Sequence, residues 1–205
     1  MQVLCILREK SQEIPLKNPC ILKLQVKMKT KISLNQLIFR QAKETDRDSI
    51  LEIYDDGSEF LKQMNIDQWQ GPDKPNLDNF KELLTNEFLY VLEDLNGDVV
   101  ATAILKNYDK DYDKIIGRWK YKSNYLVIHR LGVKKNQRNK GYAKILIKKI
   151  ESFAKEKNTY VLKIDTHEVN NIMQKLLQSL DFEYAGIVYL GGKNKRLAFE
   201  KFLKN

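Results

Sequence analysis

Cysteine and histidine are scarce in this sequence. The two cysteines among its 205 residues, Cys5 and Cys20, both lie near its beginning. A disulfide framework or a cysteine-ligated metal site therefore cannot form in the rest of the chain, which indicates a reducing compartment. The histidines are His129 and His167 alone, too few for a zinc constellation. We therefore expect no bound metal.

Long apolar runs are absent as well. The longest early run, residues 3–7, ends at Arg8. It is too short to span a bilayer, and it lacks the hydrophobic region and the small-residue cleavage site of a secretory signal. We therefore expect a cytoplasmic protein with no membrane partner.

The charge balance is only mildly basic outside the N-terminus. The whole sequence carries 36 basic and 27 acidic side chains, a net charge of +9. Residues 1–35 hold seven of the basic and two of the acidic ones, so they contribute +5 and leave +4 for the rest. This excess suits a phosphorylated ligand but is too small to indicate a nucleic-acid surface. We expect no nucleic acid among the partners.

The composition predicts a folded chain, because 42% hydrophobic and 31% charged residues are typical of globular domains. Residues 1–35 hold two of the four prolines and show no sustained period. We interpret them as an N-terminal extension of uncertain order, in which Met28 is an alternative start. Residues 36–205 form a single predicted domain, long enough for a sizeable core.

Hydrophobic periodicity divides this domain into strands and helices. Asn96-Gly97 and Gly191-Gly192 each separate two β-rich runs, which indicates two hairpins. Strands and helices alternate after residue 124, which implies a parallel crossover. Thr45 and Asp48 form a capping signal for the first helix, and residues 107–120 are expected to be a surface excursion. The predicted strands are 37–40, 88–92, 99–105, 124–133, 161–166, 184–190 and 196–202, and the predicted helices are 45–56, 77–86, 142–157 and 171–180.

A basic loop at residues 134–143, KKNQRNKGYA, joins a predicted strand to a predicted helix. The first N–H groups of a helix lack intrahelical partners and carry the positive end of its dipole, so they receive phosphate oxygens well. Gly141 allows close backbone approach, and Arg138 adds charge toward a diphosphate. An ordinary solvated basic turn has the same composition, so the loop alone does not decide between the two.

The surrounding motifs do. Residues 127–133 (VIHRLGV), followed by 138–143 (RNKGYA), resemble the acetyl-CoA signature of the GNAT superfamily of N-acetyltransferases. Downstream, 165–167 (DTH), 170–173 (NNIM) and 180–182 (LDF) resemble that family's second motif, with an aspartate where a glycine is usual. The resemblance is strongest to bacterial single-domain members with an IHRL strand and a closing RLAFE strand.

This resemblance implies an α/β (α+β) GNAT fold, a mixed central sheet that splays after its fourth strand, with flanking helices. Acetyl-CoA, the acyl donor, would lie in the gap. By analogy with the family, strand backbone pairs with the pantetheine arm, loop amides hold the diphosphate, and an asparagine side chain helps to hold the cofactor. The strand residues that would pair with the pantetheine arm are Leu131, Gly132 and Val133. The loop residues that would hold the diphosphate are Arg138, Asn139, Lys140, Gly141, Tyr142 and Ala143. The asparagine is Asn170.

The implied reaction is direct attack of a primary amine on the thioester, with no acyl-enzyme. An alkylammonium holds its proton with a pKa near 10.4, so a base must remove that proton. We assign this role to His129, which precedes Leu131 by two residues and so is expected on the same strand face. A neutral core histidine is the alternative, and His167 is a weaker candidate for the base.

One position departs from the family pattern. Many GNAT enzymes carry a tyrosine seven residues after the motif asparagine, where it can protonate the leaving thiolate, but this chain has Leu177. The alternative to an active enzyme is therefore a catalytically silent CoA-binding module. A thiolate with a reference pKa near 8.5 can nevertheless leave without a strong acid.

The expected acceptor is the amine of a small molecule or a peptide. Glu59, Asp67, Trp69 and Asp73 cluster between the first two helices, and carboxylates beside an aromatic ring suit a cationic amine. We place Asp67 and Trp69 in this acceptor site, with a tryptophan that only packs its own loop as the alternative. The sequence fits a monomer or a homodimer equally.

A calcium loop is considered and rejected. Asp109, Asp111 and Asp113 alternate as calcium ligands do, but Lys114 and Lys120 stand where the loop requires a glycine and a bidentate glutamate. No calcium site is therefore predicted.

Overall fold

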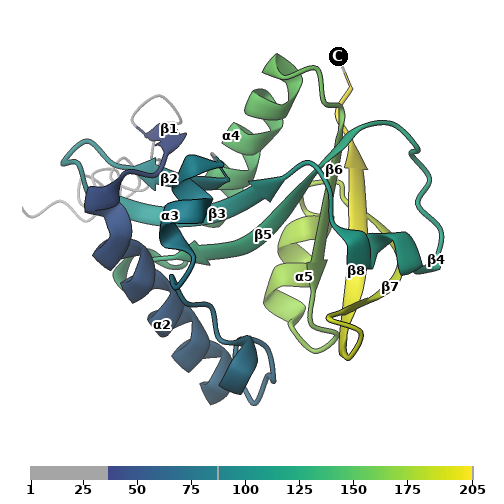
Figure 1. Ribbon diagram of the computed structural model, residues 1–205, viewed down its shortest axis with the longest axis horizontal. Coiled ribbons are helices and arrows are strands. Elements are labelled where there is room, and N and C mark those ends of the chain that lie inside the picture. The colour runs from purple at the N-terminus through teal and green to yellow at the C-terminus, as the bar shows by residue number, and fades with distance from the viewer. Residues whose placement is uncertain (1–36, 87, 205) are drawn as a thin grey trace, which may run out of the picture. The chain divides into compact units, whose positions relative to one another are not determined.

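The computed structural model describes residues 37–86 and 88–204 (Figure 1), so the predictions for residues 1–35 lie outside the described part. The described chain forms one eight-stranded mixed sheet in the order β1-β2-β3-β5-β6-β8-β7-β4. The strands are β1 (Ile38–Gln41), β2 (Leu89–Glu93), β3 (Val99–Lys106), β4 (Ile116–Gly117), β5 (Tyr125–Val133), β6 (Val161–Thr166), β7 (Glu183–Leu190) and β8 (Asn194–Phe202). The α-helices are α2 (Arg47–Gln63), α3 (Phe80–Thr85), α4 (Tyr142–Glu156) and α5 (Asn171–Gln178).

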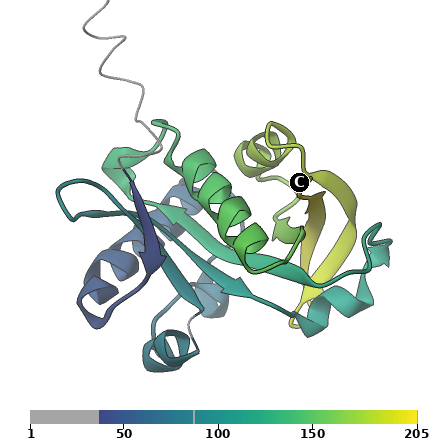
Figure 2. The same ribbon diagram turned by 90° about the horizontal axis from the view of Figure 1, so that it is seen from above.

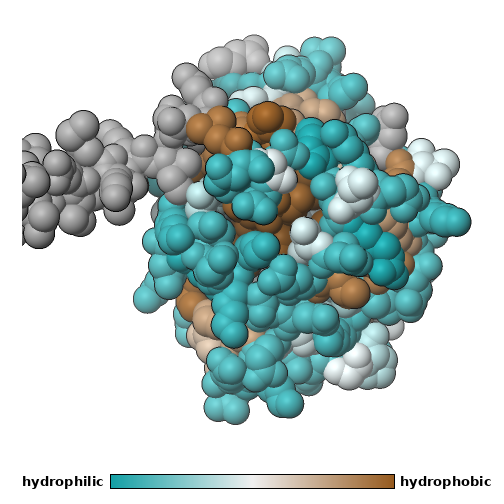
Figure 3. Space-filling view, turned by 90° about the vertical axis from the view of Figure 1, so that its left-hand side faces the viewer, coloured by the Kyte–Doolittle hydropathy of each residue, from teal (hydrophilic) through white to brown (hydrophobic). Residues whose placement is uncertain are grey.

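The two faces of the sheet are covered by different helices (Figures 1 and 2). On one face, Ile50, Ile53 and Tyr54 of α2 pack in a buried cluster with strand residues such as Val91 and Ile104. On the other face lies α4, whose hydrophobic stripe is buried as its 3–4 spacing predicts. Viewed from the β1 side, the surface is mostly hydrophilic, with one larger hydrophobic area in its upper part and smaller ones elsewhere (Figure 3). The sheet is therefore a layer between two helical layers, and the site must open where this layer is interrupted.

The predicted hairpins and the crossover are confirmed. The pairs β2–β3 and β7–β8 are antiparallel neighbours. Among the described strands, β5 and β6 form the one parallel pair, and α4 connects them. A parallel connection needs such a crossover because the chain must return to the same end of the sheet.

The interruption lies between β5 and β6. These strands pair from Tyr125 and Val161 as far as Ile128 and Ile164. Beyond that point β5 continues against β3 while β6 continues against β8, up to Thr166. The sheet therefore splays after β5, its fourth strand in spatial order, as the GNAT resemblance implies.

A β-bulge changes the predicted face of His129. Thr102 lies opposite Gly132 and Ile104 lies opposite His129, so β5 uses three residues where β3 uses two. Arg130, within the extra step, has φ 48°. The alternation rule does not hold across a bulge. The prediction that His129 shares the face of Leu131 is therefore wrong, and His129 shares a face with Gly132 instead.

The first two helices differ most from the prediction, while α4 and α5 differ only at their C-terminal ends, by one and two residues. The first helix continues past Gly57 to Gln63, because this glycine is a packing residue: a Cβ there would lie 2.6 Å from the Trp69 ring. The predicted Thr45–Asp48 cap is also wrong, since the carboxylate that accepts a hydrogen bond is that of Asp46, from the Lys43 N–H at 2.7 Å. The second helix is shorter than predicted and begins only at Phe80.

The predicted surface excursion at 107–120 is partly wrong. It contains a 3-10 helix, Lys110–Lys114, and the two-residue strand β4. Tyr112 in this segment is only 1% exposed, and its ring stacks on Trp119 with the centroids 5.3 Å apart. The segment is therefore held against the sheet next to β5 and β6, where it supplies side chains to the site.

Candidate active site

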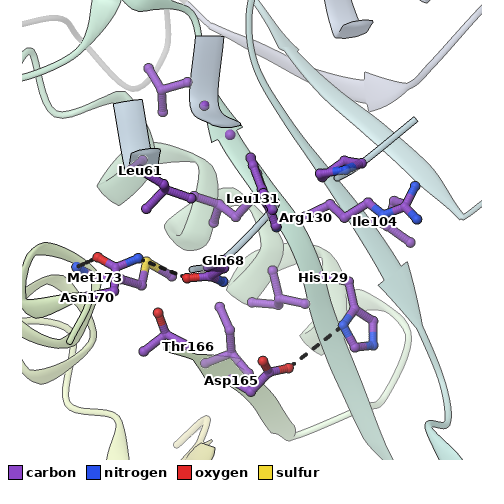
Figure 4. Close-up of a pocket in the computed structure, with 18 of the residues that line it drawn as sticks. Leu61, Gln68, Ile104, His129, Arg130, Leu131, Asp165, Thr166, Asn170 and Met173 are labelled. Carbon is purple, nitrogen blue, oxygen red and sulfur yellow. Dashed lines mark hydrogen bonds and ion pairs between the residues drawn. The ribbon is translucent and has the colours of Figure 1, made fainter. Parts of the chain in front are cut away.

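A cavity of about 690 Å³ opens where β5 and β6 diverge. Its walls come from the splayed ends of both strands, the loop after α2, the N-terminus of α4, the first turns of α5 and the β7–β8 turn (Figure 4). The sequence-predicted residues that line it are His129, Leu131, Gly132, Val133, Arg138, Asn139, Gly141, Tyr142, Ala143, Asn170 and Trp69. Residues from three separate stretches of the sequence thus meet around one space.

The N-terminus of α4 presents free backbone N–H groups to this cavity. Asn139 (φ 62°) and Gly141 (φ 88°) adopt left-handed conformations that turn the chain into the helix. The first helical hydrogen bond runs from the Ile145 N–H to the Gly141 carbonyl at 3.0 Å. The N–H groups of Tyr142, Ala143 and Lys144 therefore have no helical acceptor, which is the arrangement that binds anions.

Arg138 supplies a second anion-binding feature. Its guanidinium lies 4.8 Å from the centroid of the Phe60 ring, and its Nε donates weakly to the Val133 carbonyl at 3.4 Å. Its Nη2 is buried and has no hydrogen-bond partner among the described residues. Burial lowers the pKa of this guanidinium. An unpaired cationic donor at the cavity wall fits a diphosphate group, and Lys140, which bonds Gln137, does not line the cavity.

Asn170 caps α5 and also reaches across the cavity. Its Oδ1 accepts the Met173 N–H at 3.1 Å, and its Nδ2 donates to the Gln68 Oε1 at 3.2 Å. Figure 4 shows this side chain between α5 and the loop that carries Gln68. One Nδ2 hydrogen remains after these two bonds, so Asn170 fits the predicted cofactor role while it also joins two walls of the site.

His129 lies between two carboxylates. Its Nε2 is 3.0 Å from Asp109 Oδ2, and its Nδ1 is 4.0 Å from Asp165 Oδ1. The Tyr112 hydroxyl donates to the same Asp165 oxygen at 2.7 Å. The hydrogen bond with His129 lowers the pKa of Asp109, and burial raises the pKa of Asp165. Because His129 and both carboxylates line the cavity, the cluster is open to a ligand.

Asp109 and Tyr112 were not predicted as site residues from the sequence. Their contacts join segments that are far apart in the chain: Tyr112 and Asp165, for example, are 53 positions apart. The signal that pointed to them was the alternation of aspartates after residue 108, which was tested only as a calcium loop.

The two predicted acceptor residues have different positions. Trp69 lines the cavity, but its ring packs edge-on against Tyr54 and beside Gly57 and Gly132. These ring contacts are with α2 and β5, so the ring packs against neighbouring elements and not against its own loop, and its role in the acceptor site stays a prediction. Asp67 lies outside the cavity: its neighbour Ile66 takes the buried position and leaves Asp67 exposed. Asp67 therefore does not contribute to the wall as predicted.

Leu177, at the position where many GNAT enzymes carry a tyrosine, does not reach the site, but a threonine does. Leu177 is fully buried and does not line the cavity. Thr166, at the splayed end of β6, does line it, and its hydroxyl is buried with no hydrogen-bond partner among the described residues. This hydroxyl is therefore available to a ligand.

Within residues 37–86 and 88–204, no group of three or more His, Cys, Asp or Glu side chains is arranged to hold a metal ion. A search of the same residues for a helix long and apolar enough to cross a membrane found none.

Residues 48–182 match the family model described as Acetyltransferase (GNAT) family, which covers well over half of the sequence. The chain belongs to the GNAT acetyltransferase family. This acetyltransferase is therefore an acyltransferase enzyme, with the open mixed sheet of that family, whose members use acetyl-CoA as the acyl donor. No curated protein matches it in sequence.

Solved structures support the assignment. A GNAT-family acetyltransferase from Streptococcus agalactiae is 25% identical with a TM-score of 0.74, covering 82% of this acetyltransferase and 96% of that chain. A ribosomal-protein-alanine N-acetyltransferase from Brucella melitensis is 22% identical, covers 81% and 99%, and has a TM-score of 0.60. A putative acetyltransferase from Salmonella typhimurium, solved with acetyl-CoA, is 18% identical, covers 83% and 96%, and has a TM-score of 0.59. The last two are similar in fold alone.

Proposed function

We propose that the protein transfers acetyl from acetyl-CoA to the primary amine of a small molecule or peptide by direct attack. One observation carries the proposal: the anion-binding N-terminus of α4 and the hydrogen-bonded His129 open into the same cavity. The first suits a diphosphate and the second suits proton removal from an amine, so the cavity holds the parts for both substrates.

The acyl donor would be held by three parts of the chain. The N–H groups that begin α4 and the unpaired Nη2 of Arg138 bind the diphosphate. Residues 131–133 of β5 have no β6 neighbour, so their backbone groups on that side pair with the pantetheine arm. Asn170 contributes its remaining amide hydrogen. Acetyl-CoA, when bound, supplies an activated acyl group as a thioester.

The residues of the chain then handle the proton. An amine arrives protonated, with a pKa near 10.4, and His129 accepts one proton to free the lone pair. The C–N bond to the acetyl carbon forms and the C–S bond breaks, so that the thiolate leaves with the electron pair and takes up the second proton of the amine. Backbone N–H groups at the open edge of β5 donate to the carbonyl oxygen. No side chain is acylated.

The cavity wall favours a cationic acceptor. Asp73, Asp109 and Asp165 all line it, and their carboxylates suit an ammonium group. The Brucella neighbour is named as an enzyme acting on an alanine of a ribosomal protein, which supports a peptide or protein amine as one class of acceptor. We expect the reaction to take place in the cytoplasm.

A thiol-release assay tests the proposal. Acetyl-CoA is mixed with the full chain and a panel of polyamines, amino acids and peptides, and free CoA is measured. With at least one acceptor, the rate of CoA release should exceed the rate measured with enzyme and acetyl-CoA alone. The rival, a silent CoA-binding module, predicts that no acceptor works while calorimetry still detects CoA binding. Absence of CoA binding would contradict both.

A further inference from the structure

The carboxylate of Asp109 is held in place before any ligand binds. Its Oδ1 accepts the Asp111 N–H at 2.8 Å, which leaves Oδ2 directed at His129 Nε2. The segment around it is anchored by the buried Tyr112. The side chains of Asp109 and His129 are each 18% exposed, so the pair is largely shielded from water.

This contact fixes which imidazole nitrogen can act. Asp109 is an acceptor when ionised, and its pKa is lowered by the hydrogen bond from His129. Nε2 must therefore carry the hydrogen of the neutral imidazole, and the lone pair is left on Nδ1. Figure 4 shows the imidazole with one nitrogen directed toward Asp165, at the gap between β5 and β6.

We propose that Asp109 is a positioning residue for His129, and that Nδ1 of His129 is the atom that accepts the proton of the amine. The inference rests on the proposed function and names the atoms that carry it out. Proton transfer moves one hydrogen from the ammonium to Nδ1. The Nε2 hydrogen stays on the imidazole and remains hydrogen-bonded to the Asp109 carboxylate. The resulting imidazolium then lies between two carboxylates, Asp109 and Asp165.

Other charged and titratable groups surround this pair. Tyr112 donates to Asp165, and Arg196 Nε lies 3.9 Å from the other Asp165 oxygen. The Lys106 ammonium, on β3, acts on Asp109 through space. Asp165 thus already has a hydrogen-bond donor in Tyr112 and an ion-pair partner in Arg196, whereas His129 is the side-chain partner of Asp109.

A purely structural ion cluster elsewhere in the chain gives a contrast. Arg40 bonds both Asp46 and Glu93 and ties β1 to β2, but none of these three residues lines the cavity. Asp109 and His129 both line it. Their hydrogen bond joins the 107–120 segment to β5 and, unlike the Arg40 cluster, also faces the reaction space.

The test compares Asp109→Asn and Asp109→Ala with Asp113→Asn, in the same segment but bonded only to the exposed Tyr108. With an acceptor from the panel, both Asp109 variants should lose about tenfold to a hundredfold in kcat, while KM for acetyl-CoA stays unchanged. The Asp113→Asn control should behave as the wild type.

A second readout needs no acceptor. Nitrogen NMR of the full chain should show His129 as the Nε2–H tautomer in the wild type and a mixture of tautomers in Asp109→Ala. An Nδ1–H tautomer in the wild type, or an unchanged kcat in both variants, would overturn the inference. If the tautomer is as expected but no acceptor is turned over, the proposed function fails and the placement of Asp109 stands.

Discussion

The guanidinium of Arg138 lies on the ring of Phe60, with its central carbon 4.8 Å from the ring centroid. This contact joins the loop before α4 to the last turns of α2. It holds the guanidinium at the cavity wall with Nη2 buried and unpaired. This unpaired donor costs desolvation free energy in the free protein, and a hydrogen bond to a bound anion would offset that cost.

Replacement of Arg138 by glutamine should therefore weaken CoA binding. A hydrogen bond to a charged group contributes about 1.5–3 kcal/mol, which corresponds to roughly 10- to 100-fold in Kd. Calorimetric titration with CoA measures this change in Kd. Arg47→Gln, on a half-exposed arginine whose contact with Asp48 is 3.8 Å long, is the control and should leave Kd unchanged. Equal affinities for the two variants would remove Arg138 from the site.

Gly141→Val tests the turn into α4. Gly141 has φ 88°, a left-handed conformation that costs a side-chain-bearing residue about 1–2 kcal/mol. The variant should shift this turn and weaken CoA affinity. Gly97→Val is the matched control, because Gly97 has φ 82° and lies in the β2–β3 hairpin. Both variants should lose similar stability, but only the first should lose CoA affinity; a similar loss in both would contradict the assignment.

Thr166→Val should raise stability and lower CoA affinity together. The buried hydroxyl has no partner, so an isosteric methyl removes a cost of about 1 kcal/mol from the free protein. The same change removes a donor from the cavity. Thr102→Val is the opposite case, since its hydroxyl donates to the Tyr90 carbonyl at 2.9 Å, and it should destabilise the protein. Thermal unfolding with and without CoA measures both effects. Destabilisation of free Thr166→Val would show that the hydroxyl has a partner.

Asp46→Asn should destabilise the protein in a pH-dependent way. Burial opposes ionisation of Asp46, but hydrogen bonds from Arg40 and the Lys43 N–H outweigh it and lower its pKa below the usual 3.8. The ionised form therefore stabilises the folded state above that value, and the contribution disappears as the pH falls through the lowered pKa. We expect a loss of roughly 2–3 kcal/mol at neutral pH.

Urea unfolding at neutral and acidic pH checks this expectation. The difference between the wild type and Asp46→Asn should shrink as Asp46 becomes protonated. Asp48→Asn is the control, because the Asp48 side chain is 97% exposed, and it should change stability little at any pH. A difference that does not vary with pH would contradict the role of the ionised carboxylate.

The parts of the fold that could be predicted from sequence are those with a local signal. Asn96-Gly97 marked the β2–β3 hairpin, and the stripe that includes Leu146 and Ile150 marked the buried face of α4. The loop before α4 was predicted as an anion site because its sequence and the strand before it resemble the GNAT acetyl-CoA signature, since the loop alone did not decide. The structure places most of that loop at the cavity.

The parts that could not be predicted depend on contacts between distant segments. The bulge at Arg130 has no sequence signature, because a non-glycine residue adopts φ 48° there, and it shifted the predicted face of His129. Gly57 looked like a helix end, but its lack of a side chain makes room for Trp69. The partner of His129 came from a segment expected to lie on the surface.

We propose that the N–H groups that begin α4, those of Tyr142, Ala143 and Lys144, bind the diphosphate of CoA. A crystal structure of the full chain with CoA tests it most directly. We predict diphosphate oxygens within hydrogen-bond distance of these amides and of the Arg138 guanidinium. A diphosphate bound elsewhere on the protein would contradict it.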